Sequence, residues 1–572
     1  MPSLIYKKSL RGLTTLSVAG LVGWSAFESS DAVRHFVLAT QRCQRIATAV
    51  IEDVIDYRKT LGKSYPSEQE ELMAISRCHK RSAQRILAVL KRNGGIYIKL
   101  GQHVSSLHML PIEWTSTMKP LQDQCFPTPY EDVSALFKQE TGKDIPELFS
   151  EFDEEPIGVA SLAQVHIARD RTSGKKVAVK IQHPHLEEFV NIDLTATTLA
   201  LSWVKRVFPE FEFTWLGEEM RMNLPLELDF VHEAENAAHV RENFSDVPRT
   251  SLYIPEVIRA TKRTLVMEYI SGARVDDLGY LAAHGIDRNQ VSQELSRIFS
   301  RMVYIHGFFH ADPHAGNLLI RPSLPYSRSP YNFEIALLDH GLYFDISDDL
   351  RVNYARLWLA LIKPGQQKER RKYAELVGNI GPELYPIFES AVTGRAGLDG
   401  TWGDDPSGSK HRRAGGMIEL DAQSSDELES MRKAIFQQEG LMVSLFSMLR
   451  VIPRRVLMLF KMNDLLRSLD MELRTTHSQM RIFLIVARFC SIAAWQDDCR
   501  TFFTRCRDQG LRLSLAGTFL RNWWMYHLVY DGLRLIEWQM DLRARFVKMG
   551  AWFRGLVQHG FRGAREAAAG LA

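Results

Sequence analysis

Apolar and polar residues follow two different periods along the chain. From residue 31 to about residue 125, apolar positions recur every three or four residues, for example in 32–39 and 85–90. This spacing places apolar side chains on one face of a helix, so it predicts helical structure. Helical periodicity returns from about 183 to 245 and again from Asn289 onward. Most of the chain is therefore predicted to be helical.

A different pattern lies between these helical segments. The runs 157–168 and 176–181 are short and rich in β-forming residues, and Thr172-Ser-Gly174 separates them. This arrangement predicts a β-hairpin. A third β-like run, 264–270, ends at a Ser-Gly pair. A small sheet flanked by long helical segments predicts an α+β fold.

Composition and charge narrow the class of protein. The 572 residues have a mass of 65.5 kDa, 45% are apolar and 24% are charged, as in an ordinary globular protein. A mostly disordered chain, a collagen and a polytopic transporter are excluded. The 71 basic and 68 acidic residues give a net charge of +3, so nucleic acid is not an expected partner.

The six cysteines form no Cys-x-x-Cys pair. This usage favours reduced thiols in a reducing compartment over a zinc ribbon or a disulfide scaffold.

The N-terminus has the composition of a targeting segment. Lys7, Lys8 and Arg11 come first, no acidic residue precedes Glu28, and the stretch 13–27 is uncharged and moderately apolar. A basic, acid-poor, hydroxyl-rich start is typical of a mitochondrial presequence. We interpret the following stretch as a single membrane helix of marginal length, which predicts a protein of the mitochondrial inner membrane. A cleaved presequence with a soluble mature protein remains the alternative.

One short segment has the spacing of a kinase catalytic loop. The run His310-Ala-Asp-Pro-His-Ala-Gly-Asn317 fits H-x-D-x-x-x-x-N. Asp312 would orient the attacking group and accept its proton. Asn317 is a predicted oxygen ligand for Mg²⁺, and Asp339, in Leu337-Leu-Asp-His-Gly341, is the second.

Upstream elements complete a kinase-like order. Val177-Ala-Val-Lys180 matches the strand whose lysine contacts the α- and β-phosphates, and Glu233 is its predicted carboxylate partner. The run 267–270 is the predicted hinge, where backbone groups of Glu268 and Ile270 would read the adenine edge. The predicted cofactors are ATP or ADP and Mg²⁺. A metal cluster of His310, Asp312 and His314 is the rival interpretation, but it leaves Lys180, Asn317 and Asp339 without a role.

Together these elements resemble the UbiB family of protein-kinase-like proteins, also called aarF-domain kinases. The resemblance covers roughly residues 85–360. It rests on the catalytic loop and on three further elements: Lys99-Leu-Gly-Gln102, the loop Gly158-Val159-Ala160-Ser161 followed by Gln164-Val-His166, and Glu227-Leu-Asp229. The segments 208–215, 223–230 and 338–343 look closest to the mitochondrial aarF-domain-containing kinase 1 branch.

The resemblance implies a two-lobed, protein-kinase-like fold with helical extensions at both ends. It implies that the helix of Lys99 and Gln102 packs over the site where a protein substrate would dock, with Lys99 paired to Glu227 or Asp229. Gly158 and Val159 stand where the family's nucleotide loop has alanines, which leaves the choice between ATP and ADP open. The chain further departs from protein kinases in lacking a G-x-G-x-x-G loop and an A-P-E triplet.

The activity implied by the resemblance is that of an atypical kinase or ATPase that supports mitochondrial lipid homeostasis or membrane organisation. Its expected partners are an adenine nucleotide and mitochondrial membrane lipids, and the sequence identifies no protein partner. Three alternatives stay open: a nucleotide-gated pseudokinase scaffold, a role in ubiquinone biosynthesis, and a membrane-anchored structural protein that binds no nucleotide.

The predicted organisation has five segments. They are a targeting segment and possible membrane helix (1–30), a helical extension with the Lys-x-Gly-Gln element (31–150), a kinase-like N-lobe (151–270), a C-lobe with a flexible insertion at 394–426 (271–480), and a C-terminal helical extension (481–572). The apolar run 482–487 is too short to span a bilayer, so we expect a buried helix there. Basic helices around Trp523 and Trp524 suit either a membrane surface or packing on the C-lobe.

Overall fold

The computed structural model describes residues 31–106, 110–122, 127–184, 186–209, 213–363, 365–393, 447–476, 480–510 and 512–568. The predicted N-terminal membrane helix and the predicted insertion at 394–426 lie outside these residues. Within the described ranges, no helix is both long and apolar enough to cross a bilayer.

Two compact units are formed by segments that interleave along the sequence. The first contains the described residues up to 139 together with 154–165 and 181–222, and the second contains 140–153, 166–180 and everything described from 223 onward.

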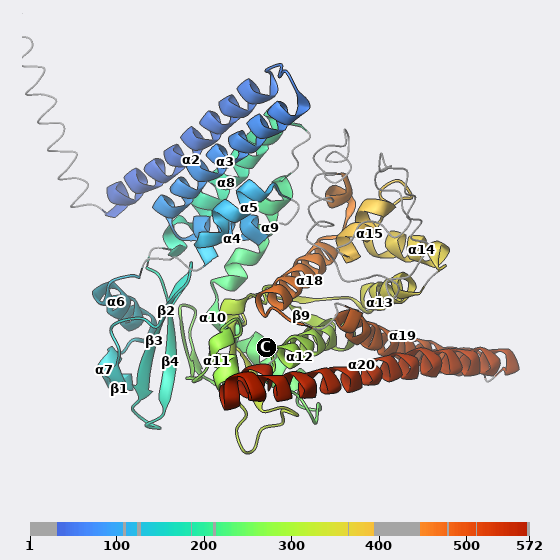
Figure 1. Ribbon diagram of the computed structural model, residues 1–572. Helices are drawn as coiled ribbons and strands as arrows, with labels where there is room; N and C mark the ends of the chain where they lie inside the picture. Colours follow the sequence, from blue (N-terminus) through green and yellow to red (C-terminus); the bar gives the residue numbers. More distant parts are fainter. Residues whose placement is uncertain are drawn as a thin grey trace, which may run out of the picture. The chain divides into compact units, whose positions relative to one another are not determined.

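The first unit is built on long helices. In Figure 1, α2 (Asp31–Leu61), α3 (Glu68–Asn93) and α8 (Leu186–Val207) lie side by side. α3 begins at Ser67, whose side chain accepts a hydrogen bond from the amide of Glu70, and ends at Gly94 with a φ of 64°. These features explain why the helix starts and stops where it does, because a hydroxyl cap satisfies a free amide and glycine tolerates positive φ. The helical prediction for this segment is confirmed.

Two shorter helices pack against α3 in the same unit, and a short helical turn packs against these two. They are α4 (Ile96–Ser106), α5 (Ile112–Met118) and the 3₁₀ turn η1 (Lys119–Gln122). Their apolar faces form a buried cluster with α2 and α3, made of Ile46, Leu90, Tyr97, Ile98, Met118 and Leu121. The Lys-x-Gly-Gln element is part of α4, so this cluster fixes its position.

The larger sheet contains six strands in the order β1 (Phe149–Phe152), β3 (Ala163–Asp170), β4 (Lys176–Gln182), β7 (Thr264–Glu268) and β6 (Val257–Ala260), with β2 (Gly158–Val159) paired to β3. The predicted hairpin is the β3–β4 pair. Its turn is closed by Gly174, which has a φ of 67° and donates its amide to the carbonyl of Asp170 at 2.8 Å. The predicted strand 157–168 is wrong in one respect. It is broken after Val159, because the amide of Ala160 bonds to the carbonyl of Ala163 at 2.8 Å and turns the chain.

The second unit also holds two small sheets. One has the order β5 (Leu252–Tyr253), β11 (Phe333–Leu337), β10 (Leu318–Pro322) and β8 (Ala273–Arg274), and the other pairs β12 (Tyr343–Asp345) with β9 (Phe308–His310). β10 and β11 are antiparallel, with Leu318 opposite Leu337. Every residue of β11 is buried. The antiparallel pairing matters for the site, because it places the residue before Leu318 near the residues after Leu337.

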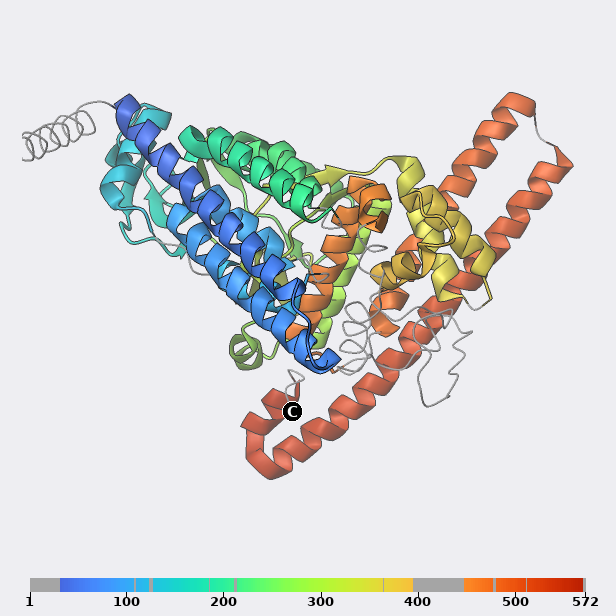
Figure 2. The ribbon, with the colours of Figure 1, turned by 90° about the horizontal axis from the view of Figure 1, so that it is seen from above.

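The other described elements are helices and helical turns. They are α6 (Tyr130–Thr141), α7 (Ile145–Leu148), α9 (Thr214–Glu227), α10 (Phe230–Asn243), α11 (Leu278–Ala283), α12 (Arg288–Arg301), η2 (Met302–His306), η3 (Ala315–Asn317), α13 (Asp348–Ile362), α14 (Gln367–Gly378), α15 (Tyr385–Thr393), α18 (Arg454–Glu472), α19 (Met480–Gln509) and α20 (Leu513–Ala568). Figure 2 shows α20 running back along α19. Leu484, Ile485 and Ala487 are buried in α19, which confirms the buried helix expected at 482–487.

Candidate active site

A buried ion pair joins the first two predicted site residues. Lys180 lies on β4, and Glu233 lies in the first turn of α10, which starts at the N-cap residue Asp229. The Lys180 ammonium donates to both oxygens of Glu233, at 2.7 and 2.9 Å. The exposed fractions of the two side chains are 14% and 3%. The structure brings these two predicted residues together, although they are 53 positions apart in sequence.

Asp339 is the third member of this charged group. Its Oδ2 lies 3.4 Å from the Lys180 ammonium, and its Oδ1 accepts the amide of Gly341 at 2.8 Å. Burial disfavours the ammonium, but the negative charges of Asp339 and Glu233 outweigh it and raise the pKa of Lys180. Lys180 is therefore a fixed positive charge at neutral pH. The Asp339 side chain is 39% exposed, so its carboxylate is accessible to a ligand.

Glu233 also anchors the segment that carries Asp339. Its Oε1 accepts the backbone amide of His340 at 3.3 Å, and Asn236 on the same helix donates to the His340 carbonyl at 2.9 Å. Burial lowers the pKa of His340 to about 3, so its ring is neutral. The ring donates one N–H to the carbonyl of Leu337 and accepts the hydroxyl of Tyr343. His340 thus acts as a buried link that holds the end of β11.

His310 couples the catalytic loop to Asp339. Its Nδ1 accepts the amide of Asp312 at 2.9 Å, so the ring proton is on Nε2, which donates to the carbonyl of Asp339 at 3.0 Å. Burial lowers the pKa of His310 to about 4, in agreement with a neutral ring. Both nitrogens are therefore used in protein hydrogen bonds. This argues against the rival metal cluster of His310, Asp312 and His314, and no group of three metal-binding side chains occurs among the described residues.

Asn317 lies at the end of η3, immediately before β10. Its carbonyl accepts the amide of Leu338 at 3.0 Å, and its side-chain amide donates to the carbonyl of Asp312 at 3.4 Å. The β10–β11 pairing therefore brings the segments of Asn317 and Asp339 together. With its NH₂ group engaged, the amide oxygen of Asn317 is left as an acceptor, and the Asp339 carboxylate is the other oxygen donor. These donors fit Mg²⁺, which typically takes one or two protein oxygens and completes its shell with phosphate and water.

Lys461 is a site residue that the sequence did not reveal. It lies on α18, and its ammonium donates to Oδ1 of Asp312 at 3.1 Å. The exposed fractions of the two side chains are 9% and 19%. Neighbouring residues fix α18: Phe460 packs on Phe388 at 5.7 Å between ring centroids, and Asn463 donates to the hydroxyl of Tyr354 at 2.9 Å. No motif surrounds Lys461, and it lies 149 residues from Asp312 in sequence, so no local signal was available.

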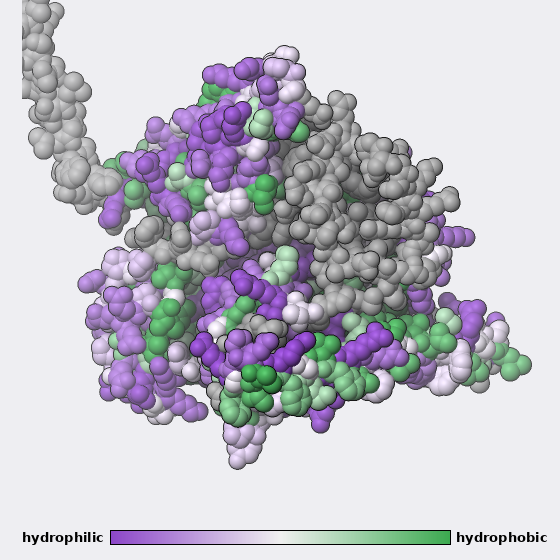
Figure 3. Space-filling view, in the orientation of Figure 1, coloured by the Kyte–Doolittle hydropathy of each residue, from purple (hydrophilic) through white to green (hydrophobic). Residues whose placement is uncertain are grey.

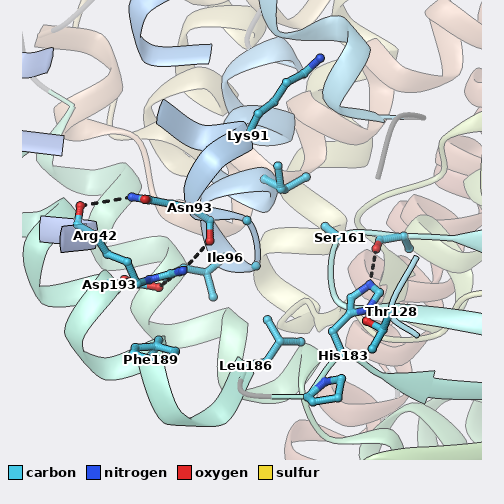
Figure 4. Close-up of a pocket in the computed structure, with 15 residues that line it drawn as sticks. Arg42, Lys91, Asn93, Ile96, Thr128, Ser161, His183, Leu186, Phe189 and Asp193 are labelled. Atoms are coloured by element: carbon cyan, nitrogen blue, oxygen red, sulfur yellow. Dashed lines mark hydrogen bonds and ion pairs between the residues drawn. The ribbon is translucent and has the colours of Figure 1, made fainter. Parts of the chain in front are cut away.

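In the first unit, the loop after β2 borders a cavity of about 250 Å³ (Figure 4). His183 holds this loop in place. One ring nitrogen donates to the carbonyl of Ala160 at 2.9 Å, and the other accepts the hydroxyl of Thr128 at 2.7 Å. Burial lowers the pKa of His183, as this neutral arrangement requires. Ser161 in turn donates to Gln102 of the Lys-x-Gly-Gln element at 3.5 Å.

Known proteins resemble this chain over most of its length. The family model described as ABC1 atypical kinase-like domain matches residues 120–373. The "ABC1 family protein MCP2 homolog" of Schizosaccharomyces pombe is 40% identical over 515 residues, with 87% of this chain and 89% of the relative covered. The "ABC1 family protein MCP2" of Saccharomyces cerevisiae is also 40% identical, with 87% and 85% covered. The "AarF domain-containing protein kinase 1" of Xenopus tropicalis is 36% identical, with 90% and 92% covered.

The chain belongs to the ABC1 family of atypical kinase-like proteins. The expected resemblance to aarF-domain kinases is confirmed, and so is an α+β kinase-like fold.

Two predicted elements of this ABC1 chain remain predictions. The first is the pairing of Lys99 with Glu227 or Asp229. Lys99 lies on α4, Glu227 is buried at the end of α9, and Asp229 caps α10 by accepting the amide of Val231 at 2.9 Å. Lys99 belongs to the first unit, and the two carboxylates belong to the second.

The second is the hinge. Glu268 ends β7, and its amide already donates to the carbonyl of Glu256 at 2.9 Å. Its carboxylate accepts the hydroxyl of Tyr253 at 2.6 Å. The amide of Glu268 is therefore engaged within the protein, which leaves its carbonyl as the backbone group proposed to read an adenine. The side chain of Ile270 is buried, so it would act through its backbone.

Proposed function

We propose that this ABC1 chain is an ATP-dependent atypical kinase or ATPase. The observation that carries the proposal is the contact of Lys180 with both Glu233 and Asp339 in the interior of the second unit. A lysine held by a carboxylate, next to an aspartate with an accessible oxygen, is the arrangement that binds the phosphates of a nucleotide in kinases. A purely structural protein has no need of it, since a buried charged group costs stability.

Each residue of the site would have a separate role in phosphoryl transfer. Lys180 would contact the phosphates, and Asn317 and Asp339 would hold Mg²⁺, which neutralises phosphate charge when bound. Asp312 would orient the attacking hydroxyl or water and take its proton. His310 holds Asp312 and Asp339 in fixed positions relative to each other, because its ring hydrogen-bonds to the backbone of both residues. The loop of Gly158, Val159, Ala160 and Ser161 would cover the phosphates.

The proposed place of action is the mitochondrial inner membrane, with a lipid or lipid-like substrate and a part in lipid homeostasis or membrane organisation. The support is the acid-poor, basic start of the chain, with Lys7, Lys8 and Arg11. A contribution to ubiquinone biosynthesis is compatible with the same chemistry.

The test is Mg²⁺-dependent ATP turnover by the full chain, with and without vesicles containing an anionic phospholipid. Asp312→Asn keeps the shape of the side chain and removes the base. We expect it to lower turnover at least 100-fold while nucleotide still protects the protein against thermal unfolding. Wild-type turnover in Asp312→Asn would overturn the enzyme assignment.

A nucleotide-gated scaffold is the second proposed function, and the Lys461–Asp312 ion pair favours it. A carboxylate held by a lysine is a poorer base than a free one, as a resting scaffold would require. A deletion strain distinguishes the two functions. Full rescue by Asp312→Asn together with failure of Lys180→Ala would establish the scaffold, and failure of both would favour the enzyme.

A further inference from the structure

The C-terminal helix α20 has one face anchored in the second unit. Leu533 is buried together with Ile362, Leu484 and Ala487. Glu537, also buried, forms ion pairs with Arg297 at 2.9 Å and with Arg488. These contacts fix the rotation of α20 about its axis, so the face that it turns away from α19 is defined.

The opposite face of α20 carries a row of exposed apolar side chains. We call this row the apolar stripe. Figure 3 shows hydrophobic residues along the lower edge of the molecule, where α20 runs. All members of the apolar stripe have exposed fractions between 38% and 93%, and they are Leu513, Leu520, Trp524, Leu528, Leu535, Trp538, Leu542, Phe546, Met549, Phe553 and Val557. At 1.5 Å per residue the stripe is about 66 Å long. Monomeric soluble proteins rarely expose an apolar surface of this extent.

The spacing of the apolar stripe fits a flat partner. From Leu535 to Val557 its members follow each other at steps of 3, 4, 4, 3, 4 and 4 residues. This is an eleven-residue repeat with 3.67 residues per turn, close to the 3.6 of a straight helix. The stripe therefore runs almost parallel to the helix axis. A left-handed coiled coil requires the tighter 3.5-residue repeat.

Arginines border the apolar stripe on both sides. At 100° per residue, Arg543 and Arg554 fall on one flank, and Arg534 and Arg545 fall on the other. All four are exposed, and in the part of the chain that the structure describes none of them forms an ion pair. Asp531, which bonds to His527 at 3.2 Å, is the acidic residue that interrupts the stripe, between Leu528 and Leu535. Asp541 lies on the flank of Arg534 and Arg545, where it pairs with Arg481 at 2.7 Å. From Leu535 to Val557, the flanks of the apolar surface therefore carry a net positive charge.

We propose that the apolar stripe of α20 docks on an anionic phospholipid bilayer, with the helix lying in the plane of the interface. Trp and Phe side chains suit the boundary between headgroups and acyl chains, and arginines on both flanks complement anionic headgroups. A second copy of the chain fits less well, because two arginine-flanked stripes would repel each other. The inference rests on the proposed function at a membrane, and it identifies the apolar stripe as the surface of the protein that contacts the membrane.

Two neighbouring exposed positions provide a matched test. Phe546 belongs to the apolar stripe, whereas Val547 is displaced by 100° around the helix, and their exposed fractions are 61% and 68%. The variants Phe546→Glu/Phe553→Glu and Val547→Glu therefore add negative charge to the same exposed helix, inside and outside the stripe. The full chain would be studied by hydrogen exchange of peptides covering 533–557, with vesicles of phosphatidylcholine alone or with added phosphatidylglycerol. The assay contains no nucleotide. A failure of membrane docking can therefore be distinguished from a failure of the proposed ATP turnover, which is measured separately.

Anionic vesicles are expected to slow exchange in these peptides for the wild type and for Val547→Glu. We expect the partition coefficient of Phe546→Glu/Phe553→Glu to fall at least about tenfold. Thermal unfolding checks that this variant is folded. The proposal is overturned if vesicles leave exchange unchanged in the wild type, or if they slow it equally in both variants. It is also overturned if the same peptides become protected at high protein concentration without lipid, since that result would assign the stripe to a second copy.

Discussion

The ammonium of Lys461 lies 3.1 Å from a carboxylate oxygen of Asp312, although the two residues are 149 positions apart in sequence. Helix α18 thereby contributes a charged residue to a loop whose own sequence, from His310 to Asn317, contains no lysine or arginine. Asp312 is only 19% exposed, so the positive charge of Lys461 compensates for the loss of hydration of the carboxylate.

Removal of Lys461 is therefore expected to affect the chemical step. In Lys461→Met the carboxylate of Asp312 loses the contact that holds its position. In an enzyme this loss of orientation outweighs the gain in basicity, so we expect kcat to fall roughly tenfold or more while KM for ATP changes less than about threefold. Lys461→Arg keeps the charge and should retain more activity than Lys461→Met. The control is Lys368→Met, which removes an exposed lysine on α14. Faster turnover in Lys461→Met would instead show that the ion pair restrains the enzyme.

The Lys180–Glu233 pair gives a second prediction. Glu233→Gln keeps the size of the side chain but leaves the buried ammonium with Asp339 alone, at 3.4 Å. We expect a loss of about 1–3 kcal/mol in the free energy of unfolding and at least about tenfold weaker binding of Mg-ATP. The raised pKa of Lys180 means that its contribution to stability is fully present at neutral pH and is lost only as the pH rises through that pKa. Chemical denaturation and calorimetric titration measure the two effects. Unchanged nucleotide affinity would contradict the proposed role of the pair.

Sequence motifs predicted the residues of this site that lie on short local elements. Lys180, Glu233, Asn317 and Asp339 are recognisable because each has neighbours that specify a strand end, a helix start or a tight loop. The structure adds what such motifs do not encode. Lys461 is set by tertiary packing of α18, and the break in the strand after Val159 depends on a backbone contact between Ala160 and Ala163. The sequence also could not predict which face of α20 is exposed, because periodicity alone does not tell which of two faces packs against the core.

The buried histidines predict how stability depends on pH. Burial lowers the pKa of His310 to about 4 and that of His340 to about 3, whereas both titrate near 6.5 in an unfolded chain. Below pH 6.5 the unfolded state gains protons that the folded state does not, so stability falls as the pH falls toward 4. Each histidine contributes about 1.4 kcal/mol per pH unit in this window.

His340→Phe tests this dependence, because it removes one of the two groups and leaves an aromatic ring. Between pH 6 and pH 4, the slope of unfolding free energy against pH should be shallower than in the wild type by about 1.4 kcal/mol per unit. The slope is the decisive quantity, because the lost hydrogen bonds of His340 alter the absolute stability at every pH. Equal slopes for His340→Phe and the wild type would count against a neutral, buried His340.

Gly158 offers a test of nucleotide handling. A Cβ atom built on Gly158 would have no heavy atom within 4 Å, so alanine fits there. Alanine restricts the backbone, and we expect Gly158→Ala to leave the melting temperature within about 2 °C and to tighten nucleotide binding roughly two- to fivefold. Titration with ATP and with ADP would show whether the two affinities change together. Weaker binding of both nucleotides would contradict the expectation that glycine loosens this loop.

Gly101, the glycine of the Lys-x-Gly-Gln element, is predicted to respond in the opposite way. A Cβ on Gly101 would lie 2.1 Å from Cδ1 of Leu121 and 3.0 Å from Cδ1 of Leu90, both in the buried cluster that positions α4. Gly101→Ala should therefore lower the free energy of unfolding by about 1–3 kcal/mol through overpacking. The double variant Gly101→Ala/Leu121→Ala relieves the contact and should be less destabilised than the sum of the two single variants. Denaturant unfolding of the four proteins measures this coupling. Additive effects would mean that close packing against Leu121 is not the reason that glycine is needed between Lys99 and Gln102.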